Sequence, residues 1–136
     1  MTILQPPHWP RPKGYSCGVS AEGTSVFVSG QIGWDEHGRF PASEIAGQVR
    51  TALHNVVTVL NEAGAGPEHV VRMTWFVTDK RAYLAAQREI GEAYRAVMGR
   101  HYPAMSVVEV SALLEDQATV EIEATAVLPG APRRSR

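Results

Sequence analysis

Two glutamates near the end of the chain are the residues best suited to chemistry. Glu121 and Glu123 lie in the stretch Val-Glu-Ile-Glu-Ala, where charged and apolar residues alternate. Successive side chains of a β-strand point to opposite faces, so both carboxylates share one face and Val120 and Ile122 share the other. A carboxylate on such a face can position a water molecule or transfer a proton. The pattern is equally compatible with a solvated surface, a subunit contact or an active site.

Other kinds of catalytic apparatus are not indicated. The histidines are scattered, and no two of them have the spacing of a metal site. The single cysteine, Cys17, has no neighbouring His or Lys that would activate it. No glycine-rich phosphate-binding loop ending in Lys-Ser or Lys-Thr occurs. We therefore expect no metal ion and no bound nucleotide.

Charge and hydropathy exclude further classes of partner. The 136 residues carry a net charge of −1 at pH 7, so no overall positive field attracts nucleic acid or anionic lipid. No apolar run approaches the ~18 residues of a membrane helix. The first residues lack the apolar core of a signal peptide. We expect a cytoplasmic protein with no nucleic-acid and no membrane partner.

The length is typical of one domain, and the flanks differ from the middle in composition. Residues 1–13 are rich in proline and predict an extended lead-in. Residues 14–128 carry all the regular apolar patterns and predict the single domain. Residues 129–136 are expected to form a flexible, solvated tail, although their arginines leave a binding arm as the alternative.

The first half of the domain predicts two strands and a helix. Gly14–Val19 and Ser25–Ser29 have strand composition, and the short turn between them predicts a hairpin. Apolar residues at helical spacing then predict a helix that is capped by Ser43 and ends at Gly64.

The second half predicts a strand, a helix and two more strands. Val70–Thr78 is apolar on both faces and is expected to be a central strand. Asp79 is a suitable cap for a second helix ending at Gly99. The stretch His101–Leu128 then contains two strands joined by an acidic connection, Leu114–Gln117.

The predicted order β-β-α-β-α-β-β is typical of an α+β fold in which two helices pack on one face of a sheet. The uncovered face would carry Glu121 and Glu123 together with Arg72 and Thr74. A sheet face that is partly apolar and uncovered usually gains a partner, so we expect a homo-oligomer.

Six motifs in order resemble the Rid (reactive intermediate deaminase; YjgF/YER057c/UK114) family, over about residues 14–127. They are Gly-Tyr-Ser at 14–16, Val-Phe-Val-Ser-Gly-Gln at 26–31, Asn-Glu-Ala-Gly at 61–64, Val-Val-Arg-Met-Thr-Trp-Phe-Val-Thr-Asp at 70–79, Tyr-Pro-Ala-Met-Ser-Val-Val-Glu-Val at 102–110 and Val-Glu-Ile-Glu-Ala at 120–124. The resemblance implies a chorismate-mutase-like fold on a mixed sheet. It also implies a barrel-like homotrimer with sites between subunits, and hydrolysis of imines or enamines without a cofactor.

The resemblance also implies roles for single residues. Tyr15 matches the family's site tyrosine, and Glu121 matches the carboxylate that positions water. Ser29 and Gly30 match a part of the pocket formed by backbone and hydroxyl groups. Gln87 lies near the place where the family often has an asparagine.

Residue 105 departs from the pattern. Deaminases of the family have an arginine here, which binds the carboxylate of a 2-imino acid through paired hydrogen bonds, whereas Met105 has no charge and no donor. Small 2-imino acids are therefore expected to be poor substrates. Four residues are candidates for a replacement cation, although a surface role is favoured for each: Arg100, His101, Arg72 and Arg39. Among them His101 is preferred, because it is close in sequence to Met105.

Two neighbours of Met105 complete the predicted binding residues. Val107 and Glu109 alternate with it along the same strand, and Glu109 either lines the cleft or pairs across the trimer. Three functions remain open. They are an imine or enamine hydrolase of unusual specificity, a binding trimer without catalysis, and, least favoured, a ribonuclease or translation inhibitor.

Overall fold

The computed structural model describes residues 1–130, so the prediction for the arginine-rich end of the tail lies outside the described residues. The elements, in order, are β1 (Thr2–Leu4), β2 (Gly18–Ser20), β3 (Thr24–Ile32), α1 (Ile45–Glu62), the 3₁₀ turn η1 (Pro67–His69), β4 (Val70–Val77), α2 (Lys80–Ala85), α3 (Gln87–Met98), β5 (Ala104–Glu109) and β6 (Val120–Leu128).

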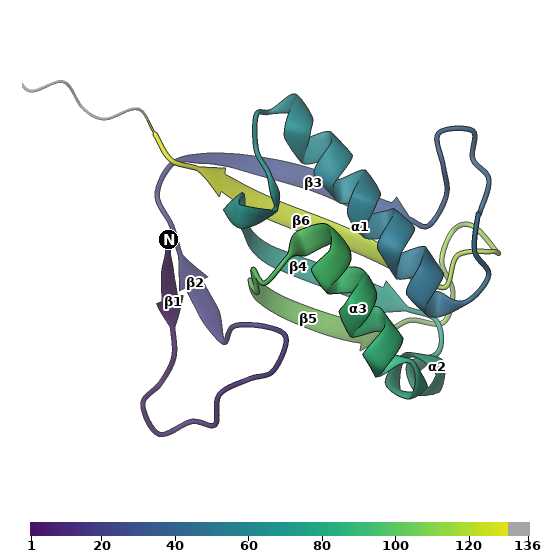
Figure 1. Ribbon diagram of the computed structural model, residues 1–136, viewed down its shortest axis with the longest axis horizontal. Coiled ribbons are helices and arrows are strands. Elements are labelled where there is room, and N and C mark those ends of the chain that lie inside the picture. Colours follow the sequence, from purple (N-terminus) through teal and green to yellow (C-terminus); the bar gives the residue numbers. More distant parts are fainter. Residues whose placement is uncertain (131–136) are drawn as a thin grey trace, which may run out of the picture.

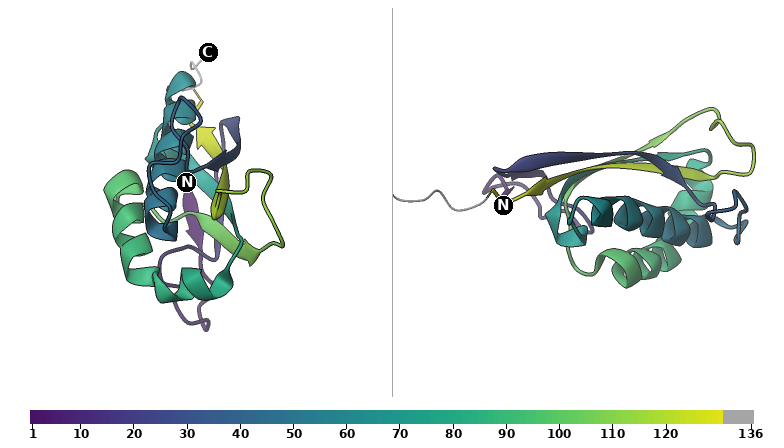
Figure 2. Two further views of the ribbon diagram at one scale, coloured as in Figure 1. Left: turned by 90° about the vertical axis from the view of Figure 1, so that its right-hand side faces the viewer. Right: turned by 90° about the horizontal axis from the view of Figure 1, so that it is seen from above.

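A four-stranded mixed sheet with the order β3-β6-β4-β5 forms the centre of the molecule. Strand β4 runs parallel to β5 and antiparallel to β6, which in turn runs antiparallel to β3. Helices α1 and α3 lie side by side over one face of this sheet, and the opposite face has no helix on it (Figures 1 and 2). The predicted α+β fold with two helices on one face is confirmed.

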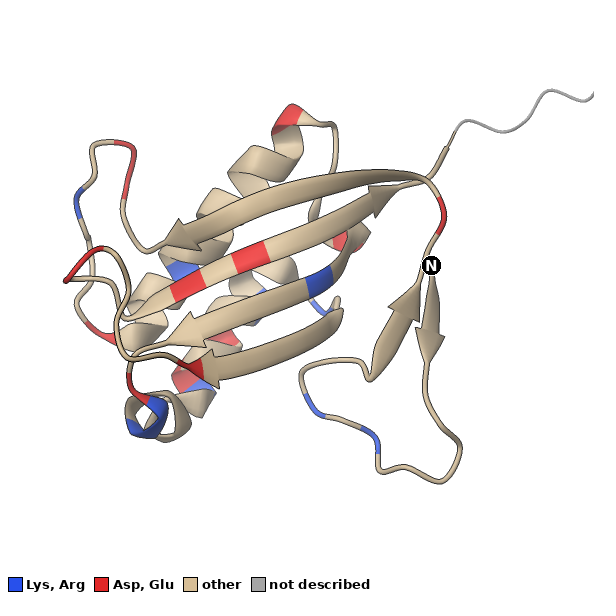
Figure 3. Ribbon diagram, turned by 180° about the vertical axis from the view of Figure 1, so that it is seen from behind, with Lys and Arg blue, Asp and Glu red and all other residues tan. Residues whose placement is uncertain are grey.

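The core lies between α1 and the sheet, as the helical spacing of its apolar residues requires. Val49, Leu53, Val56 and Leu60 of α1 are fully buried. They belong to one cluster with the inward residues of the two central strands, among them Trp75 and Ile122. Because inward and outward residues alternate, Glu121 and Glu123 lie on the open face, where Figure 3 shows acidic positions on β6 and a basic one on β4.

The predicted hairpin at the start of the domain is wrong. Strand β2 pairs with β1 as a separate two-stranded sheet, with Thr2 opposite Ser20, whereas β3 pairs with β6. Strands β3 and β6 have nine residues each, so they can pair along their whole length, whereas β2 has only three. Pairing with β6 also places Val28 of β3 in the core. The strand at residues 2–4 was not predicted, because three residues are too few to show alternation.

The helix ends were predicted better than the helix interiors. Asp79 caps α2 by accepting a hydrogen bond from the backbone N–H of Ala82, and Gly64 and Gly99 have the positive φ values of helix ends. The prediction of Ser43 as a cap is wrong, since Glu44 occupies that position without a side-chain hydrogen bond. The second helix is divided at Ala86, where φ is −108° and ψ is 19°.

The connection between β5 and β6 is anchored by a buried glutamine that the sequence did not reveal. Gln48 of α1 is 1% exposed, and its amide nitrogen donates to the carbonyls of Gln117 and Ala42 at 2.9 and 3.2 Å. Its amide oxygen accepts from the backbone and hydroxyl of Thr119 at 2.8 and 3.0 Å. Helix α1 therefore fixes where β6 begins, and so fixes the register that positions Glu121.

Candidate functional site

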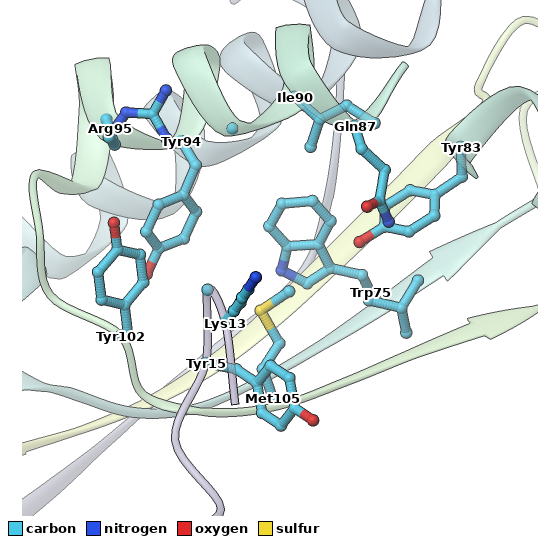
Figure 4. A pocket seen from close by; sticks show the side chains of 13 residues that line it. Lys13, Tyr15, Trp75, Tyr83, Gln87, Ile90, Tyr94, Arg95, Tyr102 and Met105 are labelled. Carbon is cyan, nitrogen blue, oxygen red and sulfur yellow. The ribbon is translucent and has the colours of Figure 1, made fainter. Parts of the chain in front are cut away.

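A cavity of about 490 Å³ lies on the helix side of the sheet, beside strand β5. Helix α3 forms one wall, β4 and β5 form another, and the segment before β2 closes one side (Figure 4). Its lining residues are Lys13, Gly14, Tyr15, Trp75, Tyr83, Gln87, Ile90, Gly91, Tyr94, Arg95, Tyr102, Met105 and Val107. Of the nine residues predicted for the site, four line this cavity: Tyr15, Gln87, Met105 and Val107.

Strand pairing positions the floor of the cavity. Val107 lies opposite Trp75 of β4 in a parallel ladder, and Met105 lies two residues earlier on the same face. The break at Ala86 separates α2 from α3, so that Tyr83 of α2 and Gln87 of α3 both reach the cavity.

Tyrosine side chains form the aromatic wall. The rings of Tyr94 and Tyr102 stack at a centroid distance of 5.5 Å and an interplanar angle of 12°, and the Tyr94 hydroxyl donates to the carbonyl of His101. Burial raises the pKa of the Tyr94 hydroxyl, and Tyr102 raises it further; burial also raises the pKa of Tyr83. Both hydroxyls therefore stay protonated at neutral pH and can act as donors.

One donor in the cavity wall has no acceptor. Trp75 is 1% exposed, and its buried indole nitrogen has no hydrogen-bond partner among residues 1–130. An unsatisfied buried N–H is costly, and in native proteins such a group usually has a functional or ligand-related reason. In Figure 4 this nitrogen is on the side of the indole ring that faces Lys13 and Met105.

The cations at the cavity are not those predicted. Lys13 and Arg95 contribute to the lining, and no carboxylate does. Neither takes part in an ion pair within residues 1–130. Lys13 lies in the segment that was predicted to be an extended lead-in, and no motif in the sequence pointed to Arg95.

The four predicted replacement cations lie elsewhere. His101 is bound through Nε2 to the carbonyl oxygen of Val70 at 2.6 Å, and with Arg100 it lines a separate hollow. Arg72 lies on the open face of the sheet. Arg39 belongs to the loop after β3, where its backbone N–H donates to the side-chain oxygen Oδ1 of Asp35. None of them lines the cavity with Met105.

Glu121 lies on the open face of the sheet, next to Gly30. A Cβ atom on residue 30 would come within 2.6 Å of Cδ and 2.8 Å of Cγ of Glu121. The absence of a side chain at Gly30 is therefore what allows the carboxylate to lie there. Ser29 lines a shallow hollow on the same face, together with Arg72 and Glu123.

The two predicted catalytic residues lie on opposite sides of the sheet within one chain. Across the central ladder, Glu121 is opposite Phe76, and both belong to the open face. Tyr15 lines the cavity with Trp75, whose neighbour across the ladder is the buried Ile122. One copy of the chain therefore does not bring Tyr15 and Glu121 into a common cavity.

The remaining predicted residue, Glu109, lies at the end of β5 outside the cavity lining. Its Oε1 accepts a hydrogen bond from the backbone N–H of Lys80 at 2.8 Å and so caps the start of α2. Within residues 1–130, no cluster of three His, Cys, Asp or Glu side chains could hold a metal ion. In the same part of the chain, every helix is too short or too polar to cross a membrane.

Comparison with known proteins identifies the relatives of this chain. Residues 9–128 match the family model described as Endoribonuclease L-PSP. The RutC family protein slr0709 of Synechocystis is 36% identical over 132 residues, which cover 95% of this chain and 98% of that protein. The 2-iminobutanoate/2-iminopropanoate deaminase of Salmonella typhimurium is 34% identical over 108 residues, covering 77% and 80% of the two chains.

Solved structures of similar proteins have the same overall architecture as this chain. A Rid-family protein from Yersinia pestis, YyfB, superposes with a TM-score of 0.81 at 30% identity, covering 93% of this chain and 98% of that chain. TdcF of Escherichia coli, solved with bound serine, has a TM-score of 0.67 at 34% identity, with 94% and 99% covered.

Proposed function

The chain belongs to the Rid (YjgF) family, and from this premise we propose that it hydrolyses the C=N bond of an imine, or of an enamine through its imine tautomer. The products would be a carbonyl compound and ammonia. Similarity to a 2-iminobutanoate/2-iminopropanoate deaminase supports this activity. The observation that carries the proposal is Glu121, a carboxylate held on the open face by the space at Gly30.

The reaction needs little more than orientation and proton transfer. The imine would react in its N-protonated form. Glu121 would accept a proton from water as the water oxygen bonds to the imine carbon, while the C=N electron pair moves to nitrogen and leaves a neutral amino alcohol. Tyr15 or Ser29 would donate a hydrogen bond to that nitrogen. Glu121 would then give its proton to the amine nitrogen, and ammonia would leave as the hydroxyl oxygen forms the carbonyl and its proton passes back to Glu121. Each step uses only the substrate, water and these side chains.

The active assembly in this proposal is a homotrimer with sites between subunits. Tyr15 and Glu121 lie on opposite faces of one sheet, so a second copy has to supply one of them. The open face also exposes apolar surface, with Phe27 76% and Val108 42% exposed. Packing the open face of one copy against the β5 edge of the next would cover these side chains and bring Glu121 toward the cavity beside that edge strand.

Met105 argues against small 2-imino acids as the preferred substrates. Loss of a charged partner for a bound carboxylate costs roughly 2–5 kcal/mol, which corresponds to a factor of about thirty to a few thousand in affinity. The substrate is then either neutral at that end or bound by another cation.

The test is ammonia release from a panel of imines that includes neutral ones. Glu121→Gln is expected to lower the rate by about 10²–10⁴-fold. The matched control is Glu123→Gln, which removes the neighbouring carboxylate of the same face and should keep most of the activity. No acceleration of any imine by the native protein would overturn the proposal.

Met105 also favours a second candidate, a trimer that binds a metabolite without converting it. Calorimetry that shows micromolar binding without turnover would support this function. Ribonuclease activity is less well supported, because the cavity lining includes no histidine and the net charge is −1.

A further inference from the structure

We propose that Lys13 and Arg95 bind the carboxylate of the substrate, which is a 2-imino acid with a large aromatic or apolar side chain. The inference rests on the proposed function and adds to it the substrate class and the residues that select it. Positive charge is absent at residue 105 and present at two other positions of the same cavity.

Arg95 is held at the cavity by the helix that carries it. Its side chain folds back along α3, so that Nη1 lies 3.2 Å from the place where a Cβ atom of Gly91 would be. A side chain at residue 91 would occupy this space, and Gly91 also lines the cavity. Figure 4 shows the guanidinium group at the Tyr94 end of the cavity. Arginine is well suited to bind a planar carboxylate at such a rim.

Lys13 approaches from the opposite wall. It precedes Gly14, whose φ of 81° turns the chain so that Lys13 and Tyr15 both line the cavity. In Figure 4 the ammonium end of Lys13 lies toward the middle of the cavity, on the side to which the Trp75 nitrogen points. Within residues 1–130 of one copy, the lining has two cations and no carboxylate. The cavity therefore keeps a net positive charge when a neighbouring copy contributes one Glu121, and it favours an anion.

Trp75 provides a second, independent indication of a ligand. Its indole N–H is buried and has no acceptor within residues 1–130, so an oxygen of a bound molecule would satisfy it. The thioether of Met105, which is flexible and makes no strong hydrogen bond, lies beside it in Figure 4. Because the N–H is buried, a ligand oxygen would reach it only after the flexible Met105 side chain moves aside.

The shape and walls of the cavity define the rest of the substrate. Five aromatic side chains line it: Tyr15, Trp75, Tyr83, Tyr94 and Tyr102. At about 490 Å³, the cavity is within the range of pockets that hold drug-sized molecules. A methyl or ethyl side chain would leave most of this volume empty, whereas an aromatic ring would contact the tyrosine wall.

The test compares binding of phenylpyruvate, the hydrolysis product of an aromatic 2-imino acid, with binding of its uncharged methyl ester by calorimetry. The acid is expected to bind at least about tenfold more tightly than the ester. Raising the salt concentration should weaken the binding of the acid and leave the binding of the ester unchanged. Lys13→Gln and Arg95→Gln should each remove most of this preference, and the double variant all of it. Arg50→Gln, which removes an exposed charge of α1 outside the cavity, is the control.

Equal binding of acid and ester, or a preference that survives in the double variant, would overturn the inference. So would failure of phenylpyruvate to bind at all. Turnover is measured separately, with an aromatic and a small imino acid generated in place by an amino acid oxidase. Acid-selective binding that depends on both cations, without turnover of any imine, would uphold the inference and overturn the proposed hydrolysis. Turnover of neutral imines without acid-selective binding would uphold the proposed hydrolysis and overturn this inference.

Discussion

Met105 occupies the position at which the resemblance to deaminases of the family implies an arginine. Met105 lies on the floor of the cavity, so a guanidinium group at this position would face the same space. We expect Met105→Arg to increase hydrolysis of 2-iminopropanoate by about 10–10³-fold, because a charge-assisted pair with its carboxylate is restored. Measured rates of imine decay check this. Met105→Gln, similar in length but uncharged, is the control, and an equal gain in both variants would contradict the expectation.

Gly30 acts through the carboxylate beside it. In Gly30→Ala the new Cβ would come within 2.6–2.8 Å of the Glu121 side chain, which would have to move. We expect kcat to fall by at least about tenfold, since a displaced carboxylate no longer positions water. The double variant Gly30→Ala/Glu121→Ala tests the cause. It should be no less active than Glu121→Ala alone, and additive losses would show that Gly30 acts by another route.

At the scale of elements, the clearest constraint is the anchoring of the β5–β6 connection by α1. In Gln48→Leu the backbone groups of Thr119, Gln117 and Ala42 lose their buried partner. We expect the free energy of unfolding to fall by about 2–4 kcal/mol, measured by urea denaturation. Gln117→Leu, at an exposed glutamine of the same connection, should change it by less than about 0.5 kcal/mol. Equal effects would contradict the assigned role of the Gln48 amide.

For the whole molecule, the proposed composite site predicts complementation between inactive variants. Tyr15→Phe and Glu121→Gln are each expected to be inactive as pure trimers. After the two are unfolded together and refolded as a 1:1 mixture, about a quarter of the sites would combine a native Tyr15 with a native Glu121 from the neighbour. Activity should return to that fraction, in a particle of about three times the 14.8 kDa chain mass by light scattering. A mixture that stays inactive would contradict a shared site.

Stability at high pH is also a property of the folded whole. The pKa of Tyr94 and of Tyr83 is raised in the folded chain, chiefly by burial, from the ordinary value of 10.0. Above about pH 10 the unfolded chain releases these protons first, so the stability present below that pH is lost as pH rises. The urea midpoint should therefore fall between pH 9 and 11. In Tyr94→Phe the slope of the unfolding free energy against pH should be shallower by the contribution of about one proton, and an unchanged slope would contradict the assignment.

Local patterns were enough to predict most of the elements. The apolar stripe of α1, the two-sided apolar strand β4 and the alternation in β6 each follow from residues close in sequence. Local residue types also marked the helix ends at Asp79, Gly64 and Gly99 correctly. The prediction of Ser43 as a cap was wrong, because a cap depends on the residue at which the first helical turn begins. The division at Ala86 left no such local signal.

The sequence by itself determined which chemical groups this protein has: a carboxylate at Glu121, a phenol at Tyr15 and no charge at Met105. Only the tertiary structure decided which of them meet. Strand pairing put Glu121 on the open face of the sheet, whereas the segment before β2 brought Tyr15 to the cavity on the other side. Chain folding also brought Lys13 and Arg95, far apart in sequence, to that cavity. The physical reason is that alternation assigns a side chain to a face from two neighbouring residues, whereas a cavity depends on register and packing between distant segments.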